Sequence, residues 1–156
     1  MFLEIISVSK KPSDWVRLAI NEYVGRLPVP SRPKFTYLNP ESSHKEIEQK
    51  LIMEAKKISR LISKGKDSLI TLDIRGENLN NEILSGKIRT LRQSRKNVKV
   101  IIGGSEGLHS SITEIAEQSW SLSSLVLPHQ LVQVLFIEQL YRTYSIEIGH
   151  PYHRGL

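Results

Sequence analysis

Apolar runs typical of β-strands alternate with segments of helical periodicity along most of this 156-residue chain. Runs at residues 2–8, 34–38, 68–74 and 97–102 are short and rich in branched or aromatic side chains. Between them, residues 14–27, 42–62 and 80–94 carry apolar residues every three or four positions. This alternation predicts βαβ units, and therefore an α/β fold with a mostly parallel sheet and helices on both of its faces.

The pattern changes after the fourth apolar run. Residues 110–118 are predicted to form a fourth helix, residues 121–127 a short fifth strand or extended segment, and residues 131–146 a last helix. Apolar side chains point in nearly every direction around this last helix, which is wider than the stripe a surface helix needs. We therefore expect it to be buried on more than one side, either deep in the core or, as the small size favours, against a second subunit.

Composition limits the class of protein. No linker or internal repeat is visible, so residues 1–156 are expected to form one domain. No apolar run approaches the roughly 20 residues that span a bilayer, and the first residues lack the features of a signal peptide, which predicts a cytoplasmic protein without membrane contact. Without cysteine there is no thiolate chemistry, and no ligand motif predicts a metal site. The net charge of +6 favours an anionic partner without identifying it.

Three glycines follow the fourth strand within five positions, in the stretch Gly103-Gly104-Ser105-Glu106-Gly107. Open α/β sheets bind ligands beyond the carboxyl ends of their strands, where glycine allows a ligand to approach the backbone closely. The alternative is a tight turn that needs glycine only for its backbone geometry. The spacing fits neither a P-loop nor a Rossmann fingerprint, so phosphate binding is disfavoured.

Two further segments are expected in the same layer: "TLDIRG" at residues 71–76 and "LSSLVLPH" at residues 122–129. With "IIGGSEGL", "EQSWSLSSLVLPHQLVQVLFIEQLYR" and the terminal "HPYHR", the chain closely resembles the SPOUT methyltransferases from end to end. The resemblance implies a C-terminal trefoil knot, bound S-adenosylmethionine, and a homodimer in which one subunit completes the pocket of the other. It further implies that the substrate is N3 of a pseudouridine in helix 69 of 23S rRNA, in the assembled bacterial ribosome.

The same resemblance implies a set of cofactor-binding residues, whose glycines would leave bare backbone where any Cβ would intrude on the cofactor. These residues are Leu72, Gly103, Gly104, Leu122, Ser123, Ser124, Leu125, Val126 and Leu127.

Methyl transfer to an imide nitrogen requires alignment of donor and acceptor, and a base or a cation to deal with the proton or the negative charge. His153 and Arg154 are expected on the substrate side, and Arg142 is expected to stabilise an anion or hold a phosphate. His129 is either a catalytic residue or a helix-start and packing residue, and Arg142 has the alternative of an ion pair with a glutamate at helical spacing. The identity of the base stays open.

The chain has no room for a separate RNA-binding domain, so RNA recognition is expected from the dimer surface. Lys10, Lys11, Arg26, Arg32 and the terminal residues are candidates, and a surface this modest predicts a shaped target such as a ribosomal particle.

Two other functions are compatible with the sequence: an RNA-binding module without catalysis, and a nucleotide-binding oxidoreductase or phosphotransferase. Binding of S-adenosylmethionine, of a dinucleotide, or of neither would separate the three.

Overall fold

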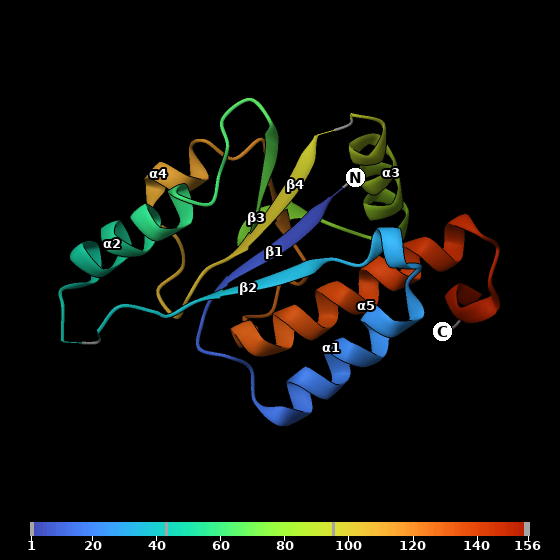
Figure 1. The fold of residues 1–156 in the computed structure, drawn as a ribbon, viewed down its shortest axis with the longest axis horizontal. Coiled ribbons are helices and arrows are strands. Elements are labelled where there is room, and N and C mark those ends of the chain that lie inside the picture. The colour runs from blue at the N-terminus through green and yellow to red at the C-terminus, as the bar shows by residue number, and fades with distance from the viewer. Residues whose placement is uncertain (1, 43, 95, 155–156) are drawn as a thin grey trace.

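A computed structural model describes residues 2–42, 44–94 and 96–154, and the predicted strand and helix alternation is present in it (Figure 1). The elements are β1 (Leu3–Val8), α1 (Asp14–Arg26), the short 3-10 helix η1 (Val29–Ser31), β2 (Lys34–Leu38), α2 (Ile47–Ser59), β3 (Asp67–Asn78), α3 (Asn81–Gln93), β4 (Asn97–Ile102), α4 (Ser110–Thr113), β5 (Gln118–Ser121), α5 (His129–Glu147) and the 3-10 helix η2 (Pro151–Arg154). All strand pairs are parallel, in the order β2-β1-β4-β3-β5. The predicted α/β class is confirmed.

Helices cover both faces of the sheet. Alternate residues of the central strands point to opposite sides, so each strand contributes apolar side chains to two separate cores. On one side, Leu3 and Ile5 of β1 belong to a core that also includes residues of α1, α3 and α5. On the other side, Ile6 and Val8 pack with residues of α2 and α4. Strands with both faces covered read as continuous apolar runs, which is the pattern seen in the sequence.

The end of the predicted fourth helix is wrong. The helix stops at Thr113 instead of continuing to Gln118, and β5 begins at Gln118, three residues before the predicted start of the fifth strand at Ser121. The backbone N–H of Glu117 donates to the carbonyl of Leu69 at 2.8 Å, which directs the chain onto the edge of the sheet instead of into another helical turn. Only Ser121 of the predicted segment 121–127 lies in a strand.

Strand β3 is longer than predicted and passes very close to β5. Its pairing with β5 is interrupted between Leu72 and Glu77 and then resumes to Asn78. In between, a Cβ on Gly76 would lie 2.7 Å from backbone atoms of Ser119 and Trp120. Glycine is therefore required at position 76 by contact between two strands.

The last helix, α5, is enclosed by its own chain on several sides. It packs beside α1 and α3, and its inner face lies on the sheet (Figure 1). No residue from His129 to Ile146 is fully exposed, and Gln133 is completely buried, with its Nε2 donating to Ser7 Oγ at 3.0 Å. The predicted burial on more than one side is confirmed, and neighbouring helices of the same chain account for much of it.

A buried carboxylate joins three strands on the other face of the sheet. Glu4 in β1 is 3% exposed and lies beside Lys99 of β4 and Lys34 of β2, with Lys34 Nζ at 3.0 Å. Burial alone would raise the pKa of Glu4, but hydrogen bonds from Lys99, Thr36 and Lys34 outweigh it and lower that pKa to about 2. The carboxylate is therefore ionised and paired at neutral pH.

Candidate functional site

A cavity of about 610 Å³ lies beyond the carboxyl ends of the strands, where ligands bind in sheets of this type. Three separate segments wall it: Leu72 to Arg75 of β3; Ile102 at the end of β4 with most of residues 103–108; and most of residues 120–132, from β5 to the first turn of α5. Its volume is in the range of small-molecule and cofactor sites. We call it the strand-end pocket.

Almost all residues predicted to bind the cofactor line this pocket. They are Leu72, Gly103, Gly104, Leu122, Ser123, Leu125, Val126 and Leu127. Ser124 is not among the lining residues, although both of its neighbours are. The sequence thus predicted which three segments converge, and the fold brings them together.

The glycine loop, residues 103–107, is shaped by contacts within itself. A Cβ on Gly103 would lie 2.8 Å from the carbonyl carbon and oxygen of Gly107, closer than real Cβ atoms approach. The N–H of Gly107 donates to the carbonyl of Gly104 at 3.1 Å, and Gly107 has a φ of 81°. The tight-turn alternative is therefore sufficient to explain Gly103 and Gly107, and close approach of a cofactor to this backbone stays a prediction.

Helix α2 supports the glycine loop from behind. Lys50 is almost fully buried, and its Nζ lies 3.2 Å from Glu106 Oε2 and 3.5 Å from Ser105 Oγ. Hydrogen bonds from Ser105 and Lys50 hold the pKa of the Glu106 carboxyl below its usual value. Lys50 was not predicted as part of the site, because a single lysine on a helix gives no signal of burial.

The floor and rim of the strand-end pocket are fixed by short-range hydrogen bonds. Trp120 is fully buried, and its Nε1 donates to Gln118 Oε1 at 2.9 Å. In the segment that follows, Ser121 Oγ donates to the carbonyl of Ser123 at 2.9 Å, and Ser123 Oγ accepts from the N–H of Leu125 at 2.9 Å. This leaves Leu125 and Val126 72% and 87% exposed at the rim, where they offer apolar surface.

Few charged groups line the pocket. Asp73 is held by Arg75, whose Nε and Nη2 each donate to it at 3.0 Å, and this pairing lowers the pKa of the Asp73 carboxyl. His129 is the first residue of α5 and also lines the pocket. Within the described residues there is no cluster of three potential metal ligands, and no helix is long and apolar enough to cross a membrane.

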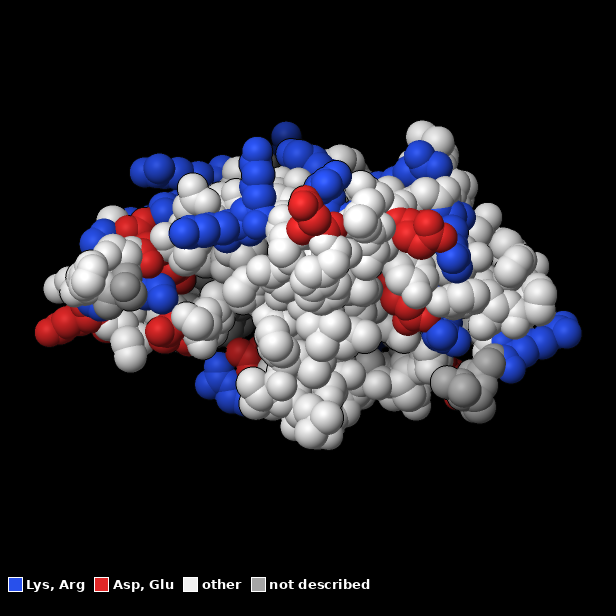
Figure 2. All heavy atoms as spheres, turned by 90° about the horizontal axis from the view of Figure 1, so that it is seen from below, with Lys and Arg blue, Asp and Glu red and all other residues white. Residues whose placement is uncertain are grey.

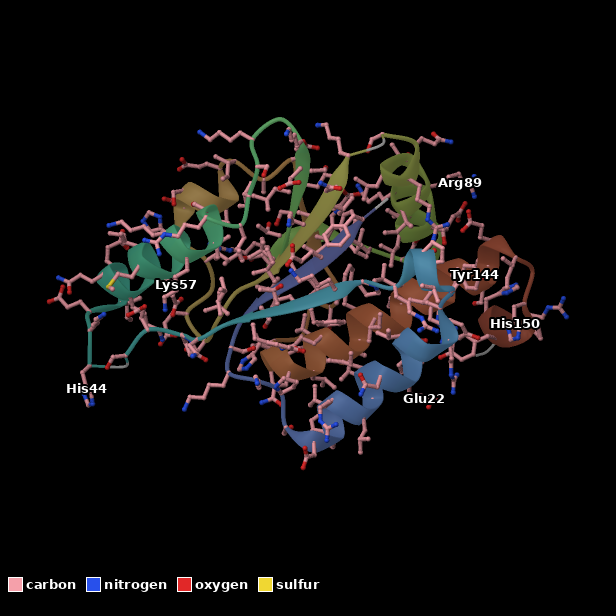
Figure 3. All side chains as sticks on the ribbon, in the orientation of Figure 1. Glu22, His44, Lys57, Arg89, Tyr144 and His150 are labelled. Carbon is pink, nitrogen blue, oxygen red and sulfur yellow. The ribbon has the colours of Figure 1, made fainter. Side chains whose placement is uncertain are left out.

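The other three catalytic candidates lie at the opposite end of α5. Arg142 follows His129 by 13 residues, which is about 20 Å along a helix. His153 and Arg154 lie in η2, beyond the end of that helix, where His150 and Tyr144 are labelled in Figure 3. The structure therefore does not bring His129 together with Arg142, His153 and Arg154 within one chain.

Arg142 is engaged by the ion pair that its sequence position predicted. Its Nε and Nη2 donate to Glu138 Oε1 at 3.0 and 2.7 Å, which raises the pKa of the guanidinium. The ring of Tyr152 lies 4.9 Å from the guanidinium carbon, within reach of a cation–π interaction. The hydroxyl of Tyr152 donates to the same Glu138 oxygen at 3.0 Å.

Tyr152, the aromatic residue of the terminal "HPYHR", has a packing role that the sequence did not predict. Burial, with hydrogen bonds to Tyr23 and Glu138, raises the pKa of its phenol. Its ring packs edge-on against Tyr141 with centroids 4.7 Å apart. Tyr152 thus fixes the segment that carries His153 and Arg154 on the end of α5 and on α1.

A family model and a curated relative both match almost the whole chain, and both are described as methyltransferases. A family model described as "Predicted SPOUT methyltransferase" matches residues 1–153. A relative from Methylobacillus flagellatus, described as ribosomal RNA large subunit methyltransferase H, is 40% identical over 156 residues, covering 99% of this chain and 99% of the relative. The similarity therefore includes all three walls of the strand-end pocket and most of the C-terminal tail.

Proposed function

Because this chain belongs to the SPOUT methyltransferase family, we propose that it is an S-adenosylmethionine-dependent methyltransferase acting on N3 of a pseudouridine in helix 69 of 23S rRNA. The relative's name supports large-subunit rRNA as the substrate. The assembled ribosome is the proposed form of that substrate, which implies a cytoplasmic location.

The strand-end pocket fits the proposed cofactor. It combines apolar side chains with stretches of glycine backbone whose N–H and C=O groups are able to read an adenine edge. Residues 72, 103, 104 and 122–127 are proposed to hold S-adenosylmethionine, which supplies an electrophilic methyl group on its sulfonium. In the family's trefoil knot, which is part of this proposal, threading of the C-terminal portion brings the glycine loop and residues 122–127 around one cavity.

The active protein is proposed to be a homodimer in which the tail of one subunit completes the pocket of the other. The observation that supports this is the separation of the strand-end pocket from the C-terminal tail along α5. A 19-residue helix is about 28 Å long, so one chain cannot bring His153 and Arg154 to its own pocket without moving the tail away from α5. In a symmetric dimer, antiparallel pairing of two α5 helices brings the tail of each subunit to the pocket of the other.

The surface below α1 and the start of α5 is suited to such a contact. Figure 2 shows Lys and Arg gathered toward the upper edge of this face, whereas much of its centre and lower half carries no charge. Trp15 and Leu18 of α1 are 57% and 62% exposed, in addition to Leu125 and Val126 at the pocket rim. These side chains offer apolar surface that the proposed second subunit would cover.

Different residues of this chain are proposed to accept the proton, to stabilise negative charge and to hold the RNA. His129, at the pocket, and His153, from the other subunit, are the two groups able to accept the proton of the pseudouridine nitrogen near neutral pH. Arg154 and Arg142 stabilise negative charge on the base or hold a neighbouring phosphate. Lys10 and Lys11 follow β1 at the same edge of the sheet, on a loop tied to α5 by the 2.8 Å hydrogen bond from Ser13 Oγ to Gln130 Oε1. They are proposed to contact phosphates beside the target nucleotide.

The test is transfer of labelled methyl from S-adenosylmethionine to 70S ribosomes that lack the modification, with free 23S rRNA in parallel and the labelled nucleotide mapped. We expect label at N3 of a pseudouridine in helix 69, on the ribosome and not on free RNA. Cofactor binding without label on either RNA would overturn the substrate, and the absence of cofactor binding would overturn the enzymatic proposal.

A further inference from the structure

Lysine and arginine side chains are concentrated at the end of the sheet where the strands begin, which is opposite the strand-end pocket. Lys34 begins β2, Lys66 directly precedes β3 and Lys96 directly precedes β4. Arg60 and Lys64 lie in the connection between α2 and β3 and are exposed. We call these five residues the strand-start surface.

Two acidic residues at this end of the sheet, Asp67 and Glu4, are buried within the protein. Asp67 is 9% exposed, with Oδ2 accepting from the N–H of Ser63 at 2.7 Å and Oδ1 accepting from Asn97 Nδ2 at 3.2 Å. Glu4 is buried among Lys99, Lys34 and Thr36. Each carboxylate is therefore directed toward the fold, and the outward side chains are mostly cationic.

Glu117 directly precedes β5 and is a further acidic residue at this end of the sheet, and Glu114, in the same connection, is exposed. Glu117 accepts from Ser68 Oγ at 2.6 Å and from Lys96 Nζ at 2.9 Å. Lys96 is thereby partly neutralised, which leaves Arg60, Lys64 and Lys66 as the main source of outward charge. None of these three forms an ion pair with another residue in the described part of the chain.

The backbone that carries Lys64 and Lys66 is well fixed. The N–H groups of Lys66 and Asp67 both donate to the carbonyl of Ser63 at 3.1 Å, and Gly65 between the lysines has a φ of 77°. The carbonyl of Lys66 accepts from the N–H of Asn97 at 3.2 Å, which ties this turn to the start of β4. Nitrogen-tipped side chains project outward from the loops along the top of Figure 3, where β3 and β4 begin.

We propose that the strand-start surface binds the phosphate backbone of ribosomal RNA at a place separate from the target nucleotide. The proposal rests on the proposed function in one respect, that the substrate is an RNA-containing particle. The strands from β2 to β3 occupy three spacings, so these cations extend over about 15 Å, the length of several successive nucleotides. Ammonium and guanidinium groups donate to phosphate oxygens without reading sequence, which suits an enzyme that recognises a shaped particle.

The position of the surface gives it a specific role. The five- and six-residue strands β2, β1 and β4 put the strand-start surface about 20 Å from the strand-end pocket. RNA held at both ends of the sheet is therefore separated by the length of about six stacked nucleotides. The surface therefore adds affinity for the ribosome and takes no part in cofactor binding or methyl transfer.

The experiment measures binding to unmodified 70S ribosomes between 50 and 200 mM KCl for the wild type and for the variant Lys64→Gln/Lys66→Gln. Each lost phosphate contact lowers the slope of log affinity against log salt by about 0.7 to 0.9, so we expect the slope to fall by about 1.5 and KM for ribosomes to rise roughly tenfold. The expected kcat and Kd for S-adenosylmethionine are those of the wild type.

Two controls isolate the effect. Lys64→Arg/Lys66→Arg keeps both charges and is expected to bind as the wild type does. Arg17→Gln/Lys45→Gln removes the same total charge elsewhere and is expected to leave the salt slope within about half a unit of the wild type. A thermal melt of each variant checks that the fold is retained.

The outcomes separate this proposal from the proposed function. If the wild type methylates ribosomes while Lys64→Gln/Lys66→Gln shows an unchanged salt slope and KM, the strand-start surface does not bind RNA. An equal loss in Arg17→Gln/Lys45→Gln also overturns the proposal, because net charge alone would then explain the effect. If the wild type transfers no methyl group but Lys64→Gln/Lys66→Gln lowers the salt slope of ribosome binding as expected, the catalytic proposal fails while the surface proposal stands.

Discussion

Gly103 and Gly107 approach each other so closely that a Cβ on Gly103 would lie 2.8 Å from the carbonyl of Gly107. The two residues close the loop that forms one wall of the strand-end pocket. The shape of that wall therefore depends on the absence of a single methyl group.

Gly103→Ala is expected to displace the glycine loop, weakening S-adenosylmethionine binding at least tenfold and costing about 1–3 kcal/mol of unfolding free energy. Titration calorimetry and urea unfolding measure the two effects. Gly86→Ala in α3 is the matched control, because a Cβ there meets nothing within 4 Å, and it should stabilise the protein by up to about 1 kcal/mol. Unchanged cofactor affinity in Gly103→Ala would show that the wall tolerates a shift.

The proposed exchange of tails between subunits predicts complementation. Gly103→Ala damages the pocket and Arg154→Ala damages the tail, so each homodimer should be nearly inactive when S-adenosylmethionine is held well below the Kd of the Gly103→Ala variant. In a mixed dimer, the intact pocket of one subunit meets the intact tail of the other. Random mixing makes half of the dimers mixed with one working site each, so methyl transfer should recover to roughly a quarter of the wild-type rate. Recovery far below this would mean that each subunit uses its own tail.

The hydroxyl of Tyr152 donates to Glu138, which also binds Arg142. Tyr152→Phe removes this hydrogen bond and the longer one to Tyr23, and is expected to lower kcat about two- to tenfold, with Kd for S-adenosylmethionine unchanged. Steady-state kinetics with ribosomes and cofactor titration measure both values. Tyr37→Phe in β2, away from the tail, is the control and should retain wild-type kcat. A change confined to stability would show that Tyr152 only packs the tail.

Glu4 makes stability depend on pH at the acidic end. Its pKa is lowered to about 2 in the folded protein, below its unfolded value of about 4.3. The stabilisation is therefore complete above pH 5 and is lost as pH falls toward 2, with an upper bound of roughly 3 kcal/mol. Urea unfolding at several pH values should show that the stability gap between wild type and Glu4→Gln narrows over this range. A gap that stays constant would contradict the assignment.

Sequence periodicity predicted the order and type of most elements, because the apolar residues of each strand and helix have the local spacing that is typical of that element. It failed after α4, where the chain from Glu114 to Glu117 has helix-forming residues but the N–H of Glu117 bonds to Leu69, almost 50 residues earlier. A pairing between distant segments overrides local propensity and leaves no trace in the spacing.

In the candidate site, too, some features could be predicted from the local sequence and others depend on contacts between distant segments. The residues of the strand-end pocket were predictable because they follow strands in a parallel sheet, and the resemblance pointed to the same segments. The burial of Lys50 and the contact between Tyr152 and Glu138 were not, since each depends on how a helix or a turn packs in three dimensions. The remoteness of Arg142 from His129 follows from helix geometry and could have been read from the sequence.

Helix α5 begins in the pocket with His129 and ends beside the tail. A helix advances about 1.5 Å and turns about 100° per residue, so inserting one residue near its middle would rotate everything after it by more than a quarter turn. Glu138, Arg142 and the tail that they hold would then face a different direction from the pocket end. Substitutions on the outer side of α5 are local changes, but an insertion or deletion within it alters both ends of the proposed active site at once. We therefore expect the length of α5 to be held fixed among functional relatives even where its residues vary.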